Sequence, residues 1–382
     1  MNILFFCWEY PPLGSGIGRY VAEMSSALQA NGHYTVVMTS RSSDFPEHEN
    51  SKSGMIYRIY DRRELRSKKA AEQTVEIAKR HDVAWIEGAD HWGECEALLR
   101  LRNRPPVVVK MHYNDVLLKS RYAQAWYPWQ RMMIDLACLR QRRSIRAERY
   151  CLEKANVLLA CCQRSLSEAQ DQGIQLPRQT AVIPNPIRPL YAWINEETCH
   201  PTLLMVGRLD VGKGLPYVRP MLENLLPAFP KLTLEIAGGD SYARGLGSIR
   251  HWFLKQLGPV RGHVRLLGNL SREALDNAYR RAWVVIVPSR WDTFPQVVLE
   301  SMARGKPIVA SPHGGMPEML DQIANAIADP ATPAFADMVR HLLGSSRERD
   351  ARGKQVRERV HAIFSPTSVA DQYIRTIASK LI

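Results

Sequence analysis

Short apolar runs separated by helical segments occur in two consecutive sets along this chain, and this alternation is its strongest constraint on fold. Five runs typical of buried strands lie in the first half: NILFFCW, YTVVMTS, DVAWIEG, PPVVVKMHY and NVLLACC. Five more lie in the second half: PTLLMVGR, LTLEIAGG, VRLLGN, WVVIVPS and KPIVAS. Buried strands that alternate with helices indicate a parallel sheet covered on both faces. We therefore predict an α/β chain with two doubly wound domains.

The turn-rich stretch IPNPIRP, residues 183–189, separates the two sets of strands. A length of 382 residues also favours about two domains. We predict an N-terminal Rossmann-like domain over residues 1–185 and a second over 186–364. A final helix, 365–382, follows a break at FSP. A ligand of such a protein is expected in the cleft at the carboxyl ends of the strands.

Composition excludes several classes of protein. No apolar run reaches membrane-spanning length, and the apolar start MNILFFCWEY has no basic region before it, so it predicts a first strand rather than a signal peptide. The seven cysteines are odd in number and show no C-x-x-C spacing. This pattern favours neither a disulfide framework nor a zinc site, and it is typical of a reducing cytoplasm.

The net charge of +13 favours anionic partners. Residues 119–149 carry eight basic and only two acidic side chains, interleaved with aromatic and apolar ones. This basic segment predicts peripheral contact with an anionic membrane. A solvated helix face with ordinary core contacts explains the same pattern. No nucleic-acid-binding module is recognisable, so nucleic acid is not an expected partner.

The glycine-rich stretch PPLGSGIGRY lies between the first strand and the first helix. Glycines at 14, 16 and 18 let backbone amides approach an anion at the positive end of the helix. The spacing departs from G-x-G-x-x-G, and the second strand lacks a suitably placed acidic residue, so a dinucleotide cofactor is a weak interpretation. A plain tight turn is the alternative.

The stretch VGRLDVGKG brings Arg208 and Lys213 directly after an apolar strand, with Gly207 at the junction. A flexible loop with one Arg and one Lys suits a diphosphate, because Arg offers paired planar donors and Lys a movable charge. Lys213 is followed by Gly214 and not by Ser or Thr, so this is no P-loop. The alternative is a surface turn with solvated charges.

Two carboxylates, Asp292 and Glu300, bracket the uncharged stretch between them in WDTFPQVVLE. We predict a helix that has Pro295 in its first turn, runs through Gln296 to about Ala303 and stops at Gly305, with Asp292 or Thr293 as its N-cap. Free amides at the helix start between two acceptors suit a polyhydroxylated, negatively charged ligand. A cap with a solvated helix face remains open. Paired acids for glycoside hydrolysis fit less well.

Several of these stretches together resemble the retaining glycosyltransferases of family 4. The resemblance rests on VGRLDVGKG, GGD at 238–240, VRLLGNL, VPS before Arg290, VVLESMARGKPIVASPHGGMPE and, in the first half, EYPPLGSGIGRY, MHYND and PNP. It covers most of the chain, and its C-terminal block is the specific part. It implies the GT-B fold, in which two Rossmann-like domains face a cleft, and a C-terminal helix that packs on the N-terminal domain.

The resemblance also implies roles for residues. Arg208 and Lys213 would hold the diphosphate and stabilise the leaving group in place of a metal, so that no cofactor is expected beside the donor substrate. Glu300 would accept hydrogen bonds from the ribose, and His112 would lie close to the transferred sugar. The remaining donor-binding positions implied are Gly14, Gly16, Ile17, Gly207, Phe294, Pro295, Gln296 and Val297.

Asp292 departs from the family, which commonly has Glu at the first position of its E-x7-E pair. In the family this acid contacts a hydroxyl of the donor sugar, so a shorter side chain bears on sugar preference. The resemblance implies retaining transfer of a sugar from a nucleoside diphosphate sugar. The basic segment suggests a glycan or lipid-linked acceptor, in cell-envelope or exopolysaccharide synthesis at the inner face of the cell membrane. A nucleotide-sugar epimerase and a non-catalytic nucleotide-sugar-binding protein are the alternatives.

Overall fold

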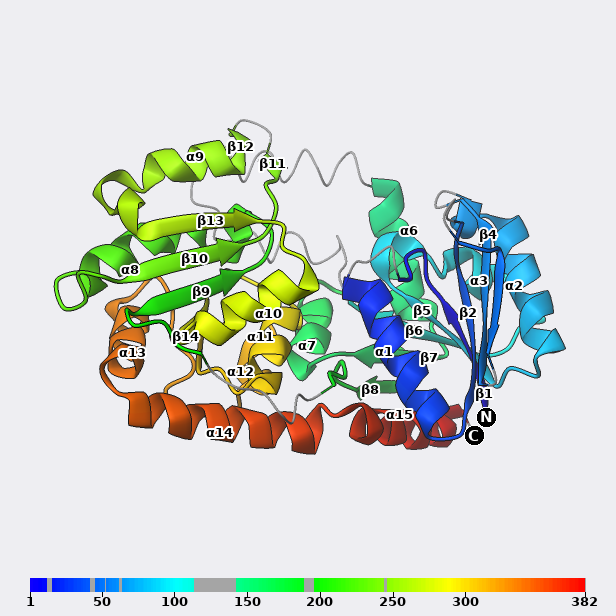
Figure 1. Cartoon of the computed structure of the whole chain (residues 1–382). Helices are drawn as coiled ribbons and strands as arrows, with labels where there is room; N and C mark the ends of the chain where they lie inside the picture. Colours follow the sequence, from blue (N-terminus) through cyan, green and yellow to red (C-terminus); the bar gives the residue numbers. More distant parts are fainter. Residues whose placement is uncertain are drawn as a thin grey trace. The chain divides into compact units, whose positions relative to one another are not determined.

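The computed structural model describes residues 1–11, 16–41, 45–51, 53–61, 64–112, 142–188, 196–243 and 246–381 (Figure 1). The chain divides into two compact units. Unit 1 comprises Met1–Pro186 and Phe364–Ile382, and unit 2 comprises Ile187–Ile363. The C-terminal segment therefore belongs to the first unit.

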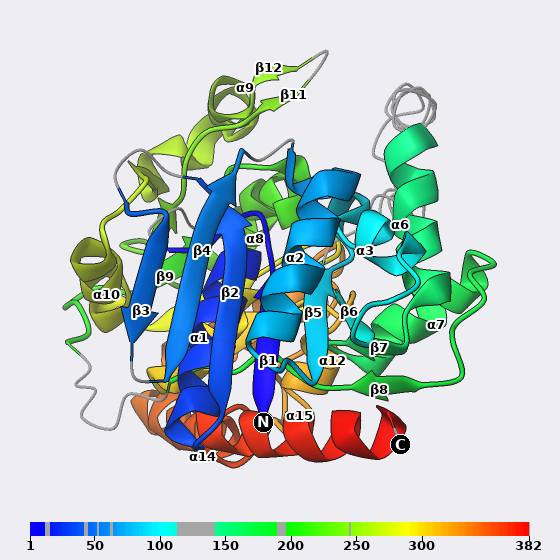
Figure 2. The same cartoon turned by 90° about the vertical axis from the view of Figure 1, so that its right-hand side faces the viewer.

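Unit 1 contains an eight-stranded sheet with the order β3-β4-β2-β1-β5-β6-β7-β8. Its strands are β1 Asn2–Phe6, β2 Tyr34–Ser40, β3 His48–Ser51, β4 Gly54–Tyr60, β5 Trp85–Ala89, β6 Val107–Met111, β7 Val157–Ala160 and β8 Thr180–Val182. All neighbours pair in parallel except β3 and β4. Strand order reverses between β1 and β5, which is the topological switch point of the unit (Figure 2).

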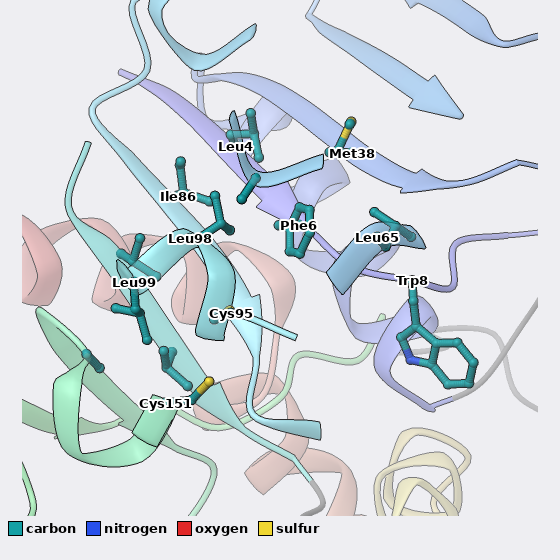
Figure 3. Packing of buried hydrophobic residues seen from close by; sticks show 14 of the residues in the cluster. Leu4, Phe6, Trp8, Met38, Leu65, Ile86, Cys95, Leu98, Leu99 and Cys151 are labelled. Atoms are coloured by element: carbon teal, nitrogen blue, oxygen red, sulfur yellow. The ribbon is translucent and has the colours of Figure 1, made fainter. Parts of the chain in front are cut away.

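Alternate residues of β1 enter two separate cores because successive side chains of a strand point to opposite faces. Ile3 and Phe5 pack with α1 and α15, whereas Leu4 and Phe6 pack with the helices of the other face (Figure 3). The helices that the structure describes in unit 1 are α1 Gly16–Ala30, α2 Lys68–Arg80, α3 Glu96–Arg100, α6 Arg142–Lys154, α7 Gln163–Asp171 and α15 Pro366–Leu381. Both faces of the sheet are thus covered.

The C-terminal helix α15 completes one of these cores. Val369, Tyr373 and Ile377 are fully buried, and the indole N–H of Trp85 on β5 donates to the Tyr373 hydroxyl at 2.9 Å. Helix α15 follows residues 364–365, which separate it from α14 Ser346–Ile363. Removal of this helix would expose the apolar face that β1 and β5 present to it.

Unit 2 contains a five-stranded parallel sheet with the order β13-β10-β9-β14-β15. Its strands are β9 Thr202–Val206, β10 Thr233–Ala237, β13 Val264–Gly268, β14 Val284–Val287 and β15 Ile308–Ala310, beside a small hairpin of β11 Tyr242–Ala243 and β12 Gly247–Ser248. Its helices are α8 Val218–Leu225, α9 Ile249–Gln256, α10 Arg272–Arg281, α11 Gln296–Ala303, α12 Met316–Met319, α13 Pro333–Gly344 and α14 Ser346–Ile363. Here the switch point lies between β9 and β14.

The ten predicted strands are confirmed, and the two sheets are Rossmann-like as expected. The antiparallel β3–β4 pair, β8 and the β11–β12 hairpin were not predicted. His48–Ser51 reads HENS and carries no apolar residue, so hydropathy gives no sign of an edge strand there. Among the helices that the structure describes, none is long and apolar enough to cross a membrane.

Candidate functional site

The loop after β9 is ordered by a carboxylate cap. Residues 211 to 213 form a short 3-10 helix, and the side chain of Asp210 accepts from the amide of Gly212 at 2.7 Å. This cap was not recognised from the sequence. Gly214 has φ 88°, and a Cβ there would collide with the carbonyl of Pro288. The loop thus lies directly against the end of β14.

An ion pair joins the loops that follow β9 and β14. The ammonium of Lys213 donates to Oδ2 of Asp292. Burial lowers the pKa of Lys213, but the adjacent Asp292 carboxylate overrides this effect, and the net pKa is raised. Lys213 is therefore a fixed positive charge at the switch point. Arg208 is 69% exposed and lies 3.6 Å from Asp210, so its guanidinium has room to reach a ligand.

Helix α11 begins without a side-chain cap. Its N-cap is Pro295, and no side chain caps it, so the prediction of Asp292 or Thr293 as the cap and Pro295 inside the first turn is wrong. The physical reason is that the Asp292 carboxylate turns to Lys213, while its carbonyl accepts from the Gly315 amide at 3.0 Å. The first amides of a helix, here Gln296 and Val297, have no acceptor within it and form its positive end. Phe294 and Pro295 lead into this start.

Glu300 lies one turn into α11, is 5% exposed and accepts from the hydroxyl of Tyr279 on α10 at 3.0 Å. Burial first, and then the charge of Glu300, raises the pKa of Tyr279 well above its usual value. The phenol therefore stays protonated and donates to the carboxylate. One turn further on, Arg304 donates to the carbonyl of Glu300 at 3.0 Å and pairs with Asp276 of α10. Helices α10 and α11 are thus joined by two side-chain pairs, one of which, Tyr279 with Glu300, orients the Glu300 carboxylate.

Two glycines let loops of unit 2 approach one another closely. Gly238 has φ 156°, and a Cβ there would collide with the carbonyl of Gly207. Gly314 has φ 69°, and a Cβ there would collide with the carbonyl of Asp292. Any larger residue would push apart the backbone around the Lys213–Asp292 pair. The GGD and HGG stretches therefore shape the candidate site through backbone contact.

In unit 1, His112 follows β6 directly. Its amide donates to Oδ1 of the fully buried Asp90 at 3.0 Å, and its ring lies 4.7 Å from the ring of Tyr20. Burial, and then the positive charges of Lys110 and His91, lower the pKa of His112 well below its usual value. His112 is therefore neutral at physiological pH.

The glycine-rich start of α1 is described only from Gly16 onward, so Gly14 lies outside the described residues. A Cβ at Gly16 would meet nothing within 4 Å, whereas one at Gly18 would lie 2.7 Å from the carbonyl oxygen of Glu9. Gly18 thus allows the helix to contact the loop after β1. Gly16 is exposed, and Ile17 is half-buried.

Family models match the two halves of the chain in turn. The model of Glycosyltransferase Family 4 matches residues 14–189, and that of Glycosyl transferases group 1 matches residues 193–359. The chain belongs to glycosyltransferase family 4. The family and the GT-B fold predicted from the sequence are both confirmed.

Relatives of this family 4 chain match it over nearly its whole length. A glycogen synthase of Mycobacterium tuberculosis is 27% identical over 97% of this chain and 92% of its own. The sucrose-phosphate synthase of Thermosynechococcus elongatus has a TM-score of 0.75 at 21% identity, over 99% of this chain and 98% of that one. The Anabaena protein HepE, solved with UDP-glucose, has a TM-score of 0.69 at 15% identity, over 99% and 100%. These structural likenesses show the fold.

The structure of this family 4 chain brings together some predicted residues and adds others. Lys213, Asp292 and the start of α11 lie at one switch point, with Arg208 and Gly207 on the same loop, whereas His112, Gly16 and Ile17 belong to unit 1. Tyr279, Asp210 and Arg304 were missed. Tyr279 reaches Glu300 from another helix, 21 residues earlier in the chain, so no local spacing reveals the pair.

Unit 1 also contains a buried polar network that sequence reasoning missed. Lys110 is fully buried and donates to the carbonyl of Ile183, while Tyr20 donates to Oε1 of Glu87 at 2.9 Å. Burial raises the pKa of Glu87, although the charge of Lys110 opposes the shift. Glu87 and Lys110 are each the single charged residue of an apolar strand, WIEGA and VVVKM. The network fixes α1 against β5 and β6 below His112.

Proposed function

We propose that this chain is a retaining glycosyltransferase that transfers a sugar from a nucleoside diphosphate sugar to a glycan or lipid-linked acceptor in cell-envelope or exopolysaccharide synthesis. The observation that carries the proposal is the Lys213 ammonium, held beside the uncapped start of α11 at the switch point of unit 2. A fixed cation and free helix amides together form a site for phosphate oxygens.

The donor is recognised in unit 2 by complementary groups. Lys213 and the more exposed Arg208 meet the diphosphate, and the backbone of Phe294, Pro295, Gln296 and Val297 meets phosphate or sugar oxygens. Glu300 accepts from the ribose hydroxyls. A carboxylate has about four acceptor positions, and Tyr279 occupies one of them at 3.0 Å. The positive charge that metals supply in other phosphate sites comes here from side chains.

The reaction breaks the bond between the anomeric carbon and the diphosphate oxygen. The acceptor oxygen forms the new bond on the same face of the sugar, and its proton passes to the departing phosphate. Lys213 and Arg208 stabilise the negative charge that develops on the leaving group. Asp292 binds a hydroxyl of the transferred sugar, and neutral His112 lies beside that sugar. We also assign donor contacts to Gly16 and Ile17, and the same role expected of Gly14 falls outside the described residues.

The test incubates the chain with one nucleoside diphosphate sugar at a time and a candidate acceptor, in buffer with EDTA to remove metal ions. NMR then identifies the product and its anomeric configuration. A new glycosidic bond with the configuration of the donor supports the proposal. An inverted product, or turnover that requires added metal, contradicts it. An epimer or free sugar formed without an acceptor would indicate the epimerase, and donor binding without turnover would indicate a non-catalytic binding protein.

We further propose that the chain acts in the cytoplasm at the inner face of the cell membrane, through the basic segment 119–149. Residues 113–141 lie outside the described structure, but Arg142, Arg143 and Arg146 at the start of α6 are exposed. Exposed cations near a membrane are each attracted to anionic lipid by about 1 kcal/mol. This supports peripheral contact, which salt would weaken.

Vesicle sedimentation tests the membrane contact. The variant with Gln at 142, 143 and 146 should bind phosphatidylserine-containing vesicles more weakly than the wild type at low salt. The matched control has Gln at 68, 79 and 80, where Lys68, Lys79 and Arg80 are exposed on α2 of the same unit. Equal weakening in both variants, or no binding by the wild type, would exclude contact through the basic segment.

A further inference from the structure

Three aromatic side chains of unit 1, Trp8, His91 and Trp92, form a cluster that we call the aromatic platform. The rings of His91 and Trp92 are stacked, with centroids 4.5 Å apart and planes at 25°. Trp8 lies 5.3 Å from Trp92 and 6.0 Å from His91. Trp8 is buried, whereas His91 and Trp92 are partly exposed. Trp8 therefore supports the two partly exposed rings, and the Arg66 guanidinium lies over the Trp92 ring, 5.8 Å from its centroid.

The platform lies at the switch point of unit 1. Trp8 follows the end of β1, beyond Phe6 and Leu65 (Figure 3), and His91 and Trp92 follow the end of β5. These two strands pair in parallel, so their carboxyl ends meet at one edge of the sheet. Ligands of open α/β sheets bind at such a point.

The backbone of Trp92 is strained. Its φ of 53° lies in the left-handed region, which a bulky aromatic residue rarely adopts. The surroundings hold it there: its amide donates to Oε1 of Glu148 at 2.9 Å, and its carbonyl accepts from Arg66 at 3.1 Å. Strain that is fixed from both sides is typical of functional sites. Its effect is to hold the indole against His91 and Trp8.

The platform adjoins the residue expected beside the transferred sugar. Asp90, which directly precedes His91, accepts from the amide of His112 at 3.0 Å. The charge of His91 also acts on His112, since it helps to lower the pKa of that ring. A ligand on the platform would therefore be near His112.

We propose that the aromatic platform stacks against one sugar ring of the acceptor. The C–H groups on a face of a pyranose ring carry partial positive charge and complement the negative face of an aromatic ring. The imidazole of the partly exposed His91 suits the hydroxyl edge of such a ring and would be unfavourable beside an acyl chain. This assignment of the acceptor class rests on the proposed function.

The test uses the whole chain labelled with 5-fluorotryptophan and 19F NMR. The signals of Trp8 and Trp92 are assigned from single Phe variants, and Trp252 on α9 of unit 2 is the reference tryptophan. The probes are the methyl glycosides of glucose, galactose and mannose, and short-chain phosphatidylcholine as the lipid arm. At least one glycoside should shift the Trp8 and Trp92 signals saturably, with the Trp252 signal unchanged.

Two variants sharpen the result. Trp92→Leu should weaken the binding of that glycoside roughly fivefold to tenfold, and Trp92→Phe, which keeps an aromatic face, by no more than about twofold. Equal weakening in the two variants would overturn stacking. The proposal would also be overturned if only the lipid probe shifts the Trp8 and Trp92 signals, or if none of the probes shifts them.

The titration needs no nucleotide sugar, so it separates the platform from the proposed function. Glycoside binding without donor turnover would support the platform and contradict the transferase. Donor turnover with no glycoside shift at Trp8 or Trp92 would do the reverse.

Discussion

The ammonium of Lys213 forms an ion pair with the carboxylate of Asp292, which lies 79 residues further along the chain. The pair joins the loops after β9 and β14 at the switch point of unit 2. In the absence of ligand, Asp292 neutralises the cation that would meet a diphosphate. Asp292 is one methylene shorter than the Glu common in the family, and its backbone carbonyl lies so close to Gly314 that a Cβ there would collide with it.

Asp292→Asn should bind nucleoside diphosphates more tightly and turn over donor more slowly. The change removes a negative charge that competes for Lys213, and we expect a gain of about threefold to tenfold in affinity, by the worth of a partly exposed ion pair. Calorimetry with ADP, GDP and UDP in turn measures it. Asp337→Asn, at an exposed carboxylate on α13, is the control. Unchanged or weaker nucleotide binding would show that the pair does not restrain Lys213.

Tyr279→Phe should weaken nucleoside diphosphate binding by roughly tenfold, because loss of its hydrogen bond leaves the buried Glu300 carboxylate less well oriented. If Glu300 holds the ribose, the loss depends on the ribose hydroxyls. The same variant should therefore bind a 2′,3′-dideoxynucleoside diphosphate about as well as the wild type does. Equal losses of affinity for both ligands would show that Tyr279 acts through the stability of the fold and not through the ribose contact.

Trp92→Gly should be more stable than Trp92→Ala by about 1 kcal/mol, since glycine adopts φ near 53° without strain. Both variants lose the indole, so their difference isolates the backbone. At Trp252, inside helix α9, glycine should instead be less stable than alanine by about 1 kcal/mol. Urea unfolding followed by circular dichroism measures all four. The same order at both sites would refute strain at Trp92.

His112→Asn should reduce the loss of stability on acidification. The lowered pKa of His112 means that the unfolded chain takes up a proton below about pH 6.5 that the folded chain does not. The free energy of unfolding therefore falls as the pH drops, by up to about 1.4 kcal/mol per pH unit until the folded pKa is reached. Urea unfolding of the wild type and variant near pH 7.5 and pH 5.5 tests this. His251→Asn, at an exposed histidine on α9, is the matched control; a like change in both variants would refute the assignment.

The parts of the fold that sequence predicts are those with a periodic signal. The buried strands and α11 from Gln296 to Ala303 follow from apolar runs and from the stop at Gly305. Contacts made across the fold leave no such signal. The Asp292 carboxylate could cap a helix or pair with a lysine, and only the approach of the Lys213 loop decides between them. Likewise, Tyr279 and Glu300 are unremarkable until α10 and α11 lie side by side.

The central claim is that Lys213 stabilises the departing diphosphate. The most direct measurement is the initial rate of nucleoside diphosphate release from the donor that the wild type uses, with Lys213→Ala beside Lys255→Ala, a matched loss of an exposed lysine on α9. We predict that Lys213→Ala lowers kcat by about a hundredfold to a thousandfold with thermal unfolding of both variants close to that of the wild type. A Lys213→Ala enzyme that is folded and turns over at the wild-type rate would contradict the account.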